Sequence, residues 1–98
     1  MTPVFLSAYH FDGDPVALAA AHDRLYQRFP PESLDLHVCV LEAGGITVFD
    51  ACPSAEAFAA FSQSAGFRQA LADAGLPQPQ LEPLGEVRDV CVRDGLAP

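Results

Sequence analysis

Three polar side chains in the middle of the chain, His37, Cys39 and Asp50, are of types that carry out acid–base or nucleophilic chemistry. They lie in two apolar runs that flank Gly44 and Gly45, a pattern typical of a β-hairpin. Side chains alternate between the two faces of a strand, so the three share one face. With both glycines as turn residues of positive φ, Asp50 lies opposite Cys39 and diagonal to His37. An Asp that orients a His general base is a recurrent acid–base unit.

Each of these residues also has a structural interpretation. In this register His37 pairs with Cys52 near the end of the sheet, and Asp50 is either solvated or caps the turn at Ser54. A nucleophilic Cys39 needs a lowered pKa and access to solvent, so a buried, unreactive thiol is the interpretation that we favour. Cys52 precedes a predicted helix, which favours a thiolate, but we interpret it as a small apolar filler.

His22 is a second candidate, because it lies at the edge of an apolar helical stripe that contains Leu18 and Leu25. It is either a hydrogen-bonded boundary residue or a pocket-lining donor or general base, and His10, which ends the first predicted strand, is placed to meet it. The candidate catalytic residues are therefore His22, His37 and Asp50. The candidate ligand-binding residues are mostly aromatic, although the phenylalanines are equally explained as core: Tyr9, His10, His22, Tyr26, Phe58, Phe61 and Phe67. Three histidines without ligand spacing predict no metal site, and the absence of phosphate-binding glycine motifs predicts no cofactor.

The elements that position these residues follow from capping, turn and breaker signals. Asp14 and Ser54 are predicted helix N-caps, and Gly75 is a predicted C-cap. In chain order we expect a strand over 4–11, a helix from Pro15 to about Phe29, and then the hairpin. A helix follows from Ser54 to Gly75; it is interrupted near Ser64, and Phe58 and Phe61 face inward. The chain then continues through a connection that contains Pro77, Pro79 and Pro83 to a last strand over 87–92.

This β-α-β-β-α-β order predicts one α+β domain over residues 1–98 with a ferredoxin-like fold. Helices cover one face of a four-stranded antiparallel sheet in that fold. The other face is also apolar, with Val40 and Phe49 among its residues, so we expect a second copy of the chain to cover it. The sequence therefore predicts a homodimer in which two sheets form a barrel.

Composition restricts the partners of the chain. Of the 98 residues half are apolar, and the net charge is −8 with only five Lys and Arg. So few basic residues predict no nucleic acid partner and no anionic membrane surface. No apolar run is long enough to span a membrane. Cys39 and Cys91 lie in apolar runs, and we expect them to be buried and reduced in a cytoplasmic compartment.

Several capping and aromatic motifs resemble those of the dimeric α+β barrel superfamily, which includes the antibiotic-biosynthesis monooxygenases. The similarity is carried by Asp50-x-x-x-Ser54-x-Glu56-Ala57-Phe58, Phe61-x-x-Ser64-x-x-Phe67-Arg68, Gly75-Leu76-Pro77-Gln78-Pro79 and the turn Phe11-Asp12-Gly13-Asp14, the last of which is typical of small actinobacterial members. The resemblance implies a homodimer with a pocket between helices and sheet in each copy. Many relatives carry a Trp where Cys52 stands, and this chain has no Trp.

Three functional hypotheses follow. The first, which we favour, is a homodimer that binds a small, largely apolar molecule of the aromatic or polyketide type in the pocket. The second is a cofactor-free monooxygenase or a cyclase-like enzyme acting on such a ligand. The third is a purely structural dimeric module, because a fold alone does not fix a function.

Overall fold

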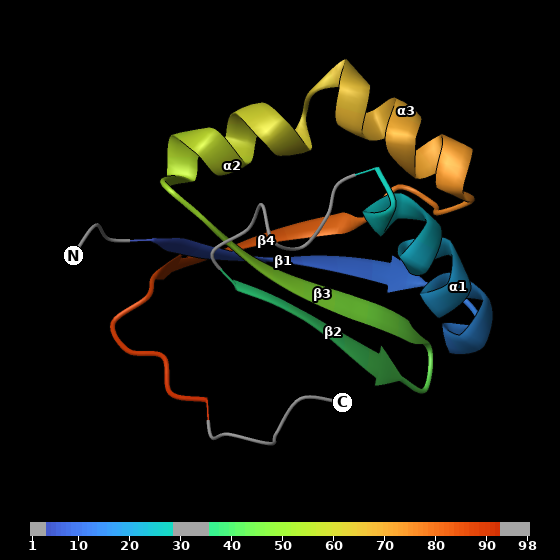
Figure 1. Cartoon of the computed structure of the whole chain (residues 1–98), viewed down its shortest axis with the longest axis horizontal. Coiled ribbons are helices and arrows are strands. Elements are labelled where there is room, and N and C mark those ends of the chain that lie inside the picture. Colours follow the sequence, from blue (N-terminus) through green and yellow to red (C-terminus); the bar gives the residue numbers. More distant parts are fainter. Residues whose placement is uncertain (1–3, 29–35, 93–98) are drawn as a thin grey trace.

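The computed structural model describes residues 4–28 and 36–92, and its elements follow the predicted order (Figure 1). These elements are β1 (Phe5–Asp12), α1 (Pro15–Tyr26), β2 (Leu36–Glu42), β3 (Gly45–Cys52), α2 (Ala55–Ser62), α3 (Ala65–Ala74) and β4 (Gln80–Glu86). The second helical segment is divided into α2 and α3, as the sequence predicts near Ser64.

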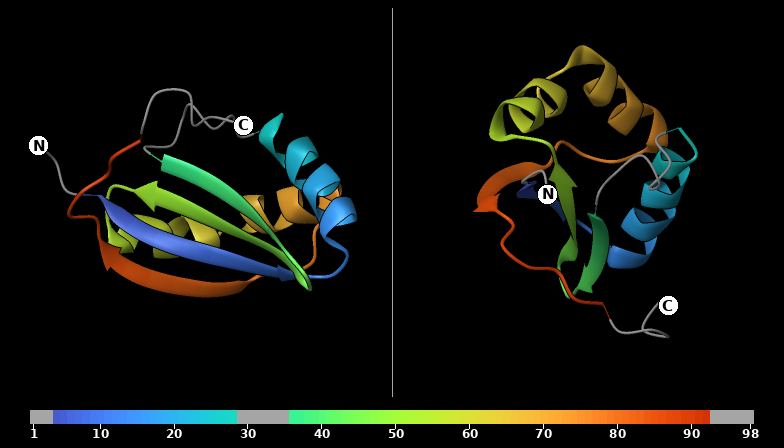
Figure 2. Two further views of the ribbon diagram at one scale, coloured as in Figure 1. Left: turned by 90° about the horizontal axis from the view of Figure 1, so that it is seen from below. Right: turned by 60° about the vertical axis from the view of Figure 1, so that its left-hand side comes forward.

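The four strands form one antiparallel sheet in the order β2-β3-β1-β4. Because β1 and β2 are both antiparallel to β3, they run parallel to each other on either side of it, and α1 makes the crossover between them. The three helices of the described residues lie on one face of the sheet (Figure 1), and none of them lies on the opposite face (Figure 2). The α+β class and the four-stranded antiparallel sheet are therefore confirmed, and the strand order is compatible with a ferredoxin-like fold.

The helix ends form as their capping residues predict. The side chain of Asp14 accepts a hydrogen bond from the backbone N–H of Ala17 at 2.9 Å, and Pro15 occupies the first turn, where its missing N–H costs nothing. Ser54 and Ser64 cap α2 and α3 in the same way, at 3.0 and 3.1 Å. Gly75 ends α3 with a φ of 89°, a conformation that favours glycine. The first helix ends at Tyr26 rather than near Phe29, which lies outside the described residues.

The core lies between the helices and the sheet. Tyr9 of β1 contacts Phe58 of α2 and Phe67 of α3 edge-on, with ring centroids 5.7 Å apart in both pairs. Arg24 of α1 donates to the carbonyl of Ala74 at 3.0 Å, which ties α1 to the end of α3. The remaining core members are apolar: Phe11, Leu18, Ala21, Leu25, Ile46, Val48, Ala70, Leu71, Ala74 and Leu76.

The predicted inward orientation of Phe61 is wrong. Its side chain is 41% exposed, and its ring lies at the rim of the core, 4.6 Å from the ring of Phe67. The second helix spans only eight residues and directs Phe58 into the core. Phe61, three positions later, lies about 60° further round the helix, which places it at the edge of the buried face rather than at its centre.

The hairpin register differs from the prediction by two residues. Glu42 pairs with Gly45, so the turn consists of Ala43 and Gly44, and neither glycine has a positive φ. Gly45 is a strand residue instead, and glycine is needed there because a Cβ would lie 1.9 Å from the carbonyl oxygen of Phe11 on β1. A shift of two preserves the alternation of side chains, so the faces remain as predicted.

The last strand is also corrected. It is β4, Gln80–Glu86, rather than 87–92, and it contains Pro83 opposite Ser7 of β1. Proline is tolerated there because β4 is an edge strand, where an N–H directed away from the sheet is not required. Val90 and Val92 are 57% and 64% exposed.

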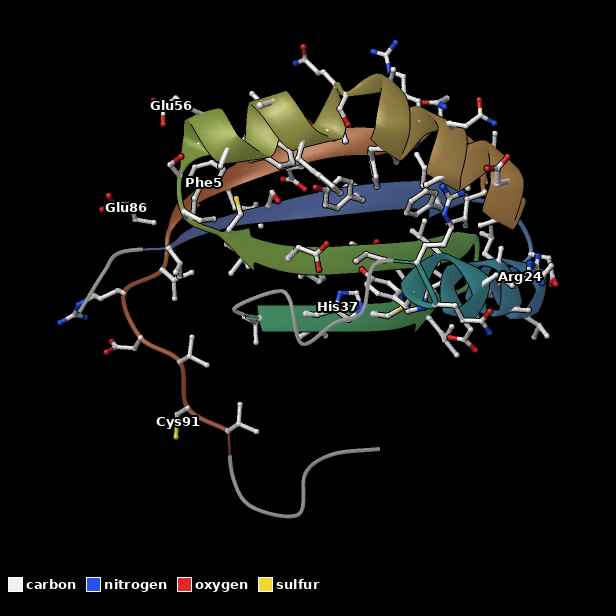
Figure 3. All side chains as sticks on the ribbon, turned by 45° about the horizontal axis from the view of Figure 1, so that its top comes forward. Phe5, Arg24, His37, Glu56, Glu86 and Cys91 are labelled. Atoms are coloured by element: carbon white, nitrogen blue, oxygen red, sulfur yellow. The ribbon has the colours of Figure 1, made fainter. Side chains whose placement is uncertain are left out.

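The predicted burial of Cys91 is also wrong, because the last strand ends at Glu86 and Cys91 lies beyond it. Cys91 lies on the segment after β4, away from the sheet (Figure 3), and is exposed.

Candidate functional site

The corrected register places His37 of β2 directly opposite Asp50 of β3. Nδ1 of His37 lies 2.5 Å from Oδ1 of Asp50, and each side chain is only 14% exposed. Cys39, which the sequence places opposite Asp50, pairs with Val48 instead. The structure therefore unites two of the three candidate catalytic residues more closely than the predicted register did.

The first helix adds His22 and Tyr26, which lie one turn apart and so share a face. Tyr26 places its hydroxyl 2.9 Å from Nδ1 of His37, and Nε2 of His22 lies 3.1 Å from Nε2 of His37. Figure 3 places His37 on β2, beside the first helix. Burial of Leu18 and Leu25 holds this helix face over the sheet. We refer to His22, Tyr26, His37 and Asp50 as the histidine cluster.

A small pocket lies next to the cluster, between the helices and the sheet. Its volume is about 20 Å³, which is room for about one water molecule. Its polar lining consists of Tyr9, His22, Tyr26 and Asp50, and the rest is apolar: Phe11, Leu25, Val48, Phe67 and Leu76. His37 is not part of the lining, although its neighbours His22, Tyr26 and Asp50 are. The sequence predicts a mostly apolar cavity with His22 as its principal polar group on the helical side; the lining of this small pocket includes His22 and, from the same helix, Tyr26.

Burial determines the charge states at the pocket. It lowers the pKa of His22, whose side chain is 13% exposed, so this ring favours its neutral form. Burial, followed by the negative charge of Asp50, raises the pKa values of Tyr9 and Tyr26 above their ordinary value, so both phenols remain protonated donors. Burial likewise raises the pKa of the Cys39 thiol, which supports an unreactive thiol there rather than a nucleophile.

The predicted ligand-binding residues divide into two groups. Tyr9, His22, Tyr26 and Phe67 line the pocket. Phe58 packs against Phe5 and Tyr9 in the core and does not line it, and neither does Phe61.

His10 is not brought to the pocket. It lies on the open face of the sheet, where its ring bonds Thr47 at 3.0 Å and Glu82 at 2.8 Å. A shallow hollow of about 380 Å³ surrounds it, with Asp12 and Glu42 among its mainly polar lining residues. This hollow is larger than the pocket, but it lacks an enclosed apolar surface that would bind a ligand.

Sequence reasoning missed Phe11, Leu25, Val48 and Leu76 as lining residues. One of them carried a usable signal. Leu76 follows the C-cap Gly75, and its N–H bonds the carbonyl of Leu71 at 2.9 Å. In this type of helix end the residue after the glycine folds back onto the core, so the Gly75-Leu76 pair predicts an inward Leu76.

Within residues 4–28 and 36–92, no group of three His, Cys, Asp or Glu side chains is arranged to hold a metal ion. None of the helices in the same ranges has the length and apolar character needed to cross a bilayer. No family model, curated protein or solved structure matches the chain.

Proposed function

We propose that this chain binds a small, largely apolar molecule in the pocket between the helices and the sheet. The observation that carries the proposal is the convergence of Asp50, His22 and two protonated tyrosines on an otherwise apolar pocket. A few converging polar groups in an apolar cavity are typical of a ligand site. Because the pocket has room for about one water, ligand entry requires side chains at its wall, such as Phe67 and Leu76, to move.

The polar lining restricts the ligand further. Asp50 accepts hydrogen bonds and repels anions, and the net charge of −8 adds to this repulsion. Tyr9 and Tyr26 donate, because their pKa values are raised. A neutral molecule with an apolar or aromatic body and one hydroxyl or carbonyl group satisfies both requirements.

The second candidate function is a cofactor-free enzyme, a monooxygenase or a cyclase-like catalyst, on the same kind of ligand. The hydrogen bond between His37 and Asp50 favours it, since a carboxylate held by a histidine is a competent acid–base unit. The proton that is transferred would pass to or from Asp50, because Asp50 lines the pocket and His37 does not.

A titration with three probes of one shape, naphthalene, 1-naphthol and 1-naphthoate, tests the proposal. We expect 1-naphthol to shift the amide NMR signals of pocket residues most, naphthalene less and 1-naphthoate least. Asp50→Asn should reduce the preference for 1-naphthol over naphthalene. Absence of binding by all three probes would favour the purely structural module. Conversion of 1-naphthol under oxygen, lost in His22→Ala, would favour the enzyme over the binding protein.

We also propose that two copies associate through the open faces of their sheets, as in a dimeric α+β barrel. Val38, Val40 and Leu84 on this face are 43%, 39% and 46% exposed. Full burial of one such side chain contributes about 1.5–3 kcal/mol, so each of these contributes about 1 kcal/mol on association. A face that pairs with its own copy doubles the number of these side chains.

Light scattering at micromolar concentration tests this association, and we expect a dimer. Val40→Asp should produce monomers, since a dimer would bury an unpaired carboxylate. Val16→Asp is the matched control, because Val16 lies on α1 and is 76% exposed. A parent protein that is monomeric and folded at this concentration would contradict the proposal.

A further inference from the structure

The two histidine rings of the cluster meet edge to edge. Their planes differ by 15° and their centroids are 5.2 Å apart, while the Nε2 atoms of His22 and His37 are only 3.1 Å apart. The distance between the centroids is longer than the distance between the Nε2 atoms, and the difference is close to the sum of the two ring radii. Each Nε2 atom therefore lies on the side of its ring that faces the other ring. This is the geometry of one hydrogen bond shared by two imidazoles rather than of face-to-face stacking.

This shared bond is the middle of a longer chain of hydrogen bonds. At one end, Nδ1 of His22 lies 3.3 Å from Oδ1 of Asp23, a carboxylate that is 81% exposed. At the other end, Nδ1 of His37 lies 2.5 Å from Oδ1 of Asp50, which lines the pocket. Four side chains thus connect solvent with the pocket.

The Asp50 end determines where the protons in this chain lie. A carboxylate only accepts hydrogen bonds, so Nδ1 of His37 carries a proton that it donates to Asp50. When both rings are neutral, Nε2 of His37 is an acceptor and Nε2 of His22 donates to it. When the pair binds one more proton, His37 donates from both nitrogens, Nε2 of His22 accepts, and the proton of His22 moves to Nδ1, facing Asp23. Both states keep the bond between the rings and the bond to Asp50. The contact between Nδ1 of His22 and Asp23 is a hydrogen bond only in the second state, because in the first state both atoms are acceptors.

We propose that Asp23, His22, His37 and Asp50 form a proton relay between solvent and the pocket. The relay supplies the path by which the proposed acid–base function exchanges protons with solvent. The use of the relay rests on that function, but its geometry does not. In this role Asp50 gives or takes the proton at the pocket, and His37, which does not line the pocket, is a positioning residue that acts through Asp50. His22 lines the pocket as well and passes protons between Asp23 and His37.

One passage through the relay moves one proton and breaks no heavy-atom bond. A proton from solvent binds Nδ1 of His22 beside Asp23, and the Nε2 proton of His22 passes to Nε2 of His37. The Nδ1 proton of His37 then passes to Asp50, which becomes a neutral acid at the pocket. Each ring ends as a neutral tautomer, and the reverse passage carries a proton from Asp50 to solvent.

Tyr26 is compatible with every state of the relay. Its hydroxyl lies 2.9 Å from Nδ1 of His37, and a hydroxyl both donates and accepts. It accepts from Nδ1 when that atom carries a proton and donates to Nδ1 after the proton has passed to Asp50. The titratable groups that interact with His22 or with Tyr26 come from four elements: Asp23 on α1, His37 and Cys39 on β2, Asp50 on β3 and Tyr9 on β1.

Imidazole ¹⁵N NMR of the ligand-free protein between pH 5 and 8 tests the relay. We expect His37 to be protonated at Nδ1 throughout, and His22 to change from the Nε2–H to the Nδ1–H tautomer as the pair binds one proton. His10 is the internal control, since it lies on the open face, away from the two rings. In His22→Phe, His37 should keep its Nδ1 proton and lose the shared titration. His22→Gln serves the same purpose if the phenylalanine variant does not fold.

Asp23→Asn tests the outer end of the relay, because it removes the negative charge beside Nδ1 of His22 without touching His37, while the amide oxygen remains an acceptor. It should shift the proton uptake of the pair to lower pH. The relay is overturned if His37 carries its proton on Nε2 at neutral pH, or if His22 keeps one tautomer throughout. Since no ligand is present, either result leaves the binding proposal standing, and absence of ligand binding leaves the relay standing.

Discussion

Replacement of Gly45 by alanine is the most direct test of the hairpin register on which the cluster depends. The new Cβ would lie 1.9 Å from the carbonyl oxygen of Phe11 and 3.0 Å from its carbon, and both are backbone atoms of β1. A side chain can rotate out of the way, but here β1 and β3 must move apart. The pairing of Asp12 with Gly45 and the bond from the N–H of Gly13 to the carbonyl of Gly44, at 2.9 Å, lie at this point.

The magnitude follows from two contributions. Overpacking of a well-fitted site costs about 1–3 kcal/mol, and the loss of a backbone hydrogen bond costs about 1 kcal/mol more. We therefore expect Gly45→Ala to lower the free energy of unfolding by about 3 kcal/mol. For a chain of this length that lowers Tm by about 12–24 °C.

Gly44→Ala is the matched control in the same turn. Nothing lies within 4 Å of its Cβ, and its φ is not positive, so the change should alter stability by less than about 1 kcal/mol. Urea and thermal unfolding should be followed by circular dichroism at one fixed protein concentration, since association shifts Tm. If both variants melt within about 2 °C of each other, the close approach of Gly45 to β1 is refuted.

Three further predictions concern the cap of α3, the buried histidine and the thiols. Ser64→Ala removes the acceptor of the Phe67 N–H and should lower the free energy of unfolding by about 1 kcal/mol in urea titrations; an unchanged midpoint would contradict the cap. Burial lowers the pKa of His22 below its unfolded value near 6.5, so the unfolded chain binds more protons and stability should fall as pH drops below about 6.5. His22→Phe should flatten this dependence, and an equally steep decline in the variant would exclude His22 as its source. Iodoacetamide followed by mass spectrometry should modify exposed Cys91 before Cys39, whose pKa burial raises; the reverse order would contradict that burial.

Element order and helix ends were predictable because they depend on local chemistry. An Asp or Ser followed by a helical run binds the free N–H groups of the first turn, and Gly75 accepts a φ that other residues resist. The clustering of His22 with His37 was not predictable in this way. It depends on where α1 crosses the sheet, which is determined by core packing between segments distant in the sequence.

The errors have the same origin. From the sequence alone, β4 resembles a connection, because it has few apolar residues and contains Pro83. Only the strand order shows that β4 is an edge strand, where proline is tolerated. The apolar residues of 87–92 resemble a strand when the sequence is considered without the sheet. In the structure both sides of β1 are already paired, one with β3 and the other with β4, so this segment has no place beside β1.

The Gly44-Gly45 pair links the fold to the proposed chemistry. Read as a two-residue turn, it places Cys39 opposite Asp50 and leaves His37 at the sheet end. In the structure Gly45 belongs to β3, because only glycine allows this point of the strand to approach Phe11 of β1. That approach moves the turn to Ala43 and Gly44 and sets His37 against Asp50. The constraint that positions the acid–base pair is therefore a contact between backbones, far along the strand from the pair itself. A change at Gly45 that lets the register slip by two should abolish the bond between His37 and Asp50 while leaving both residues on the same face.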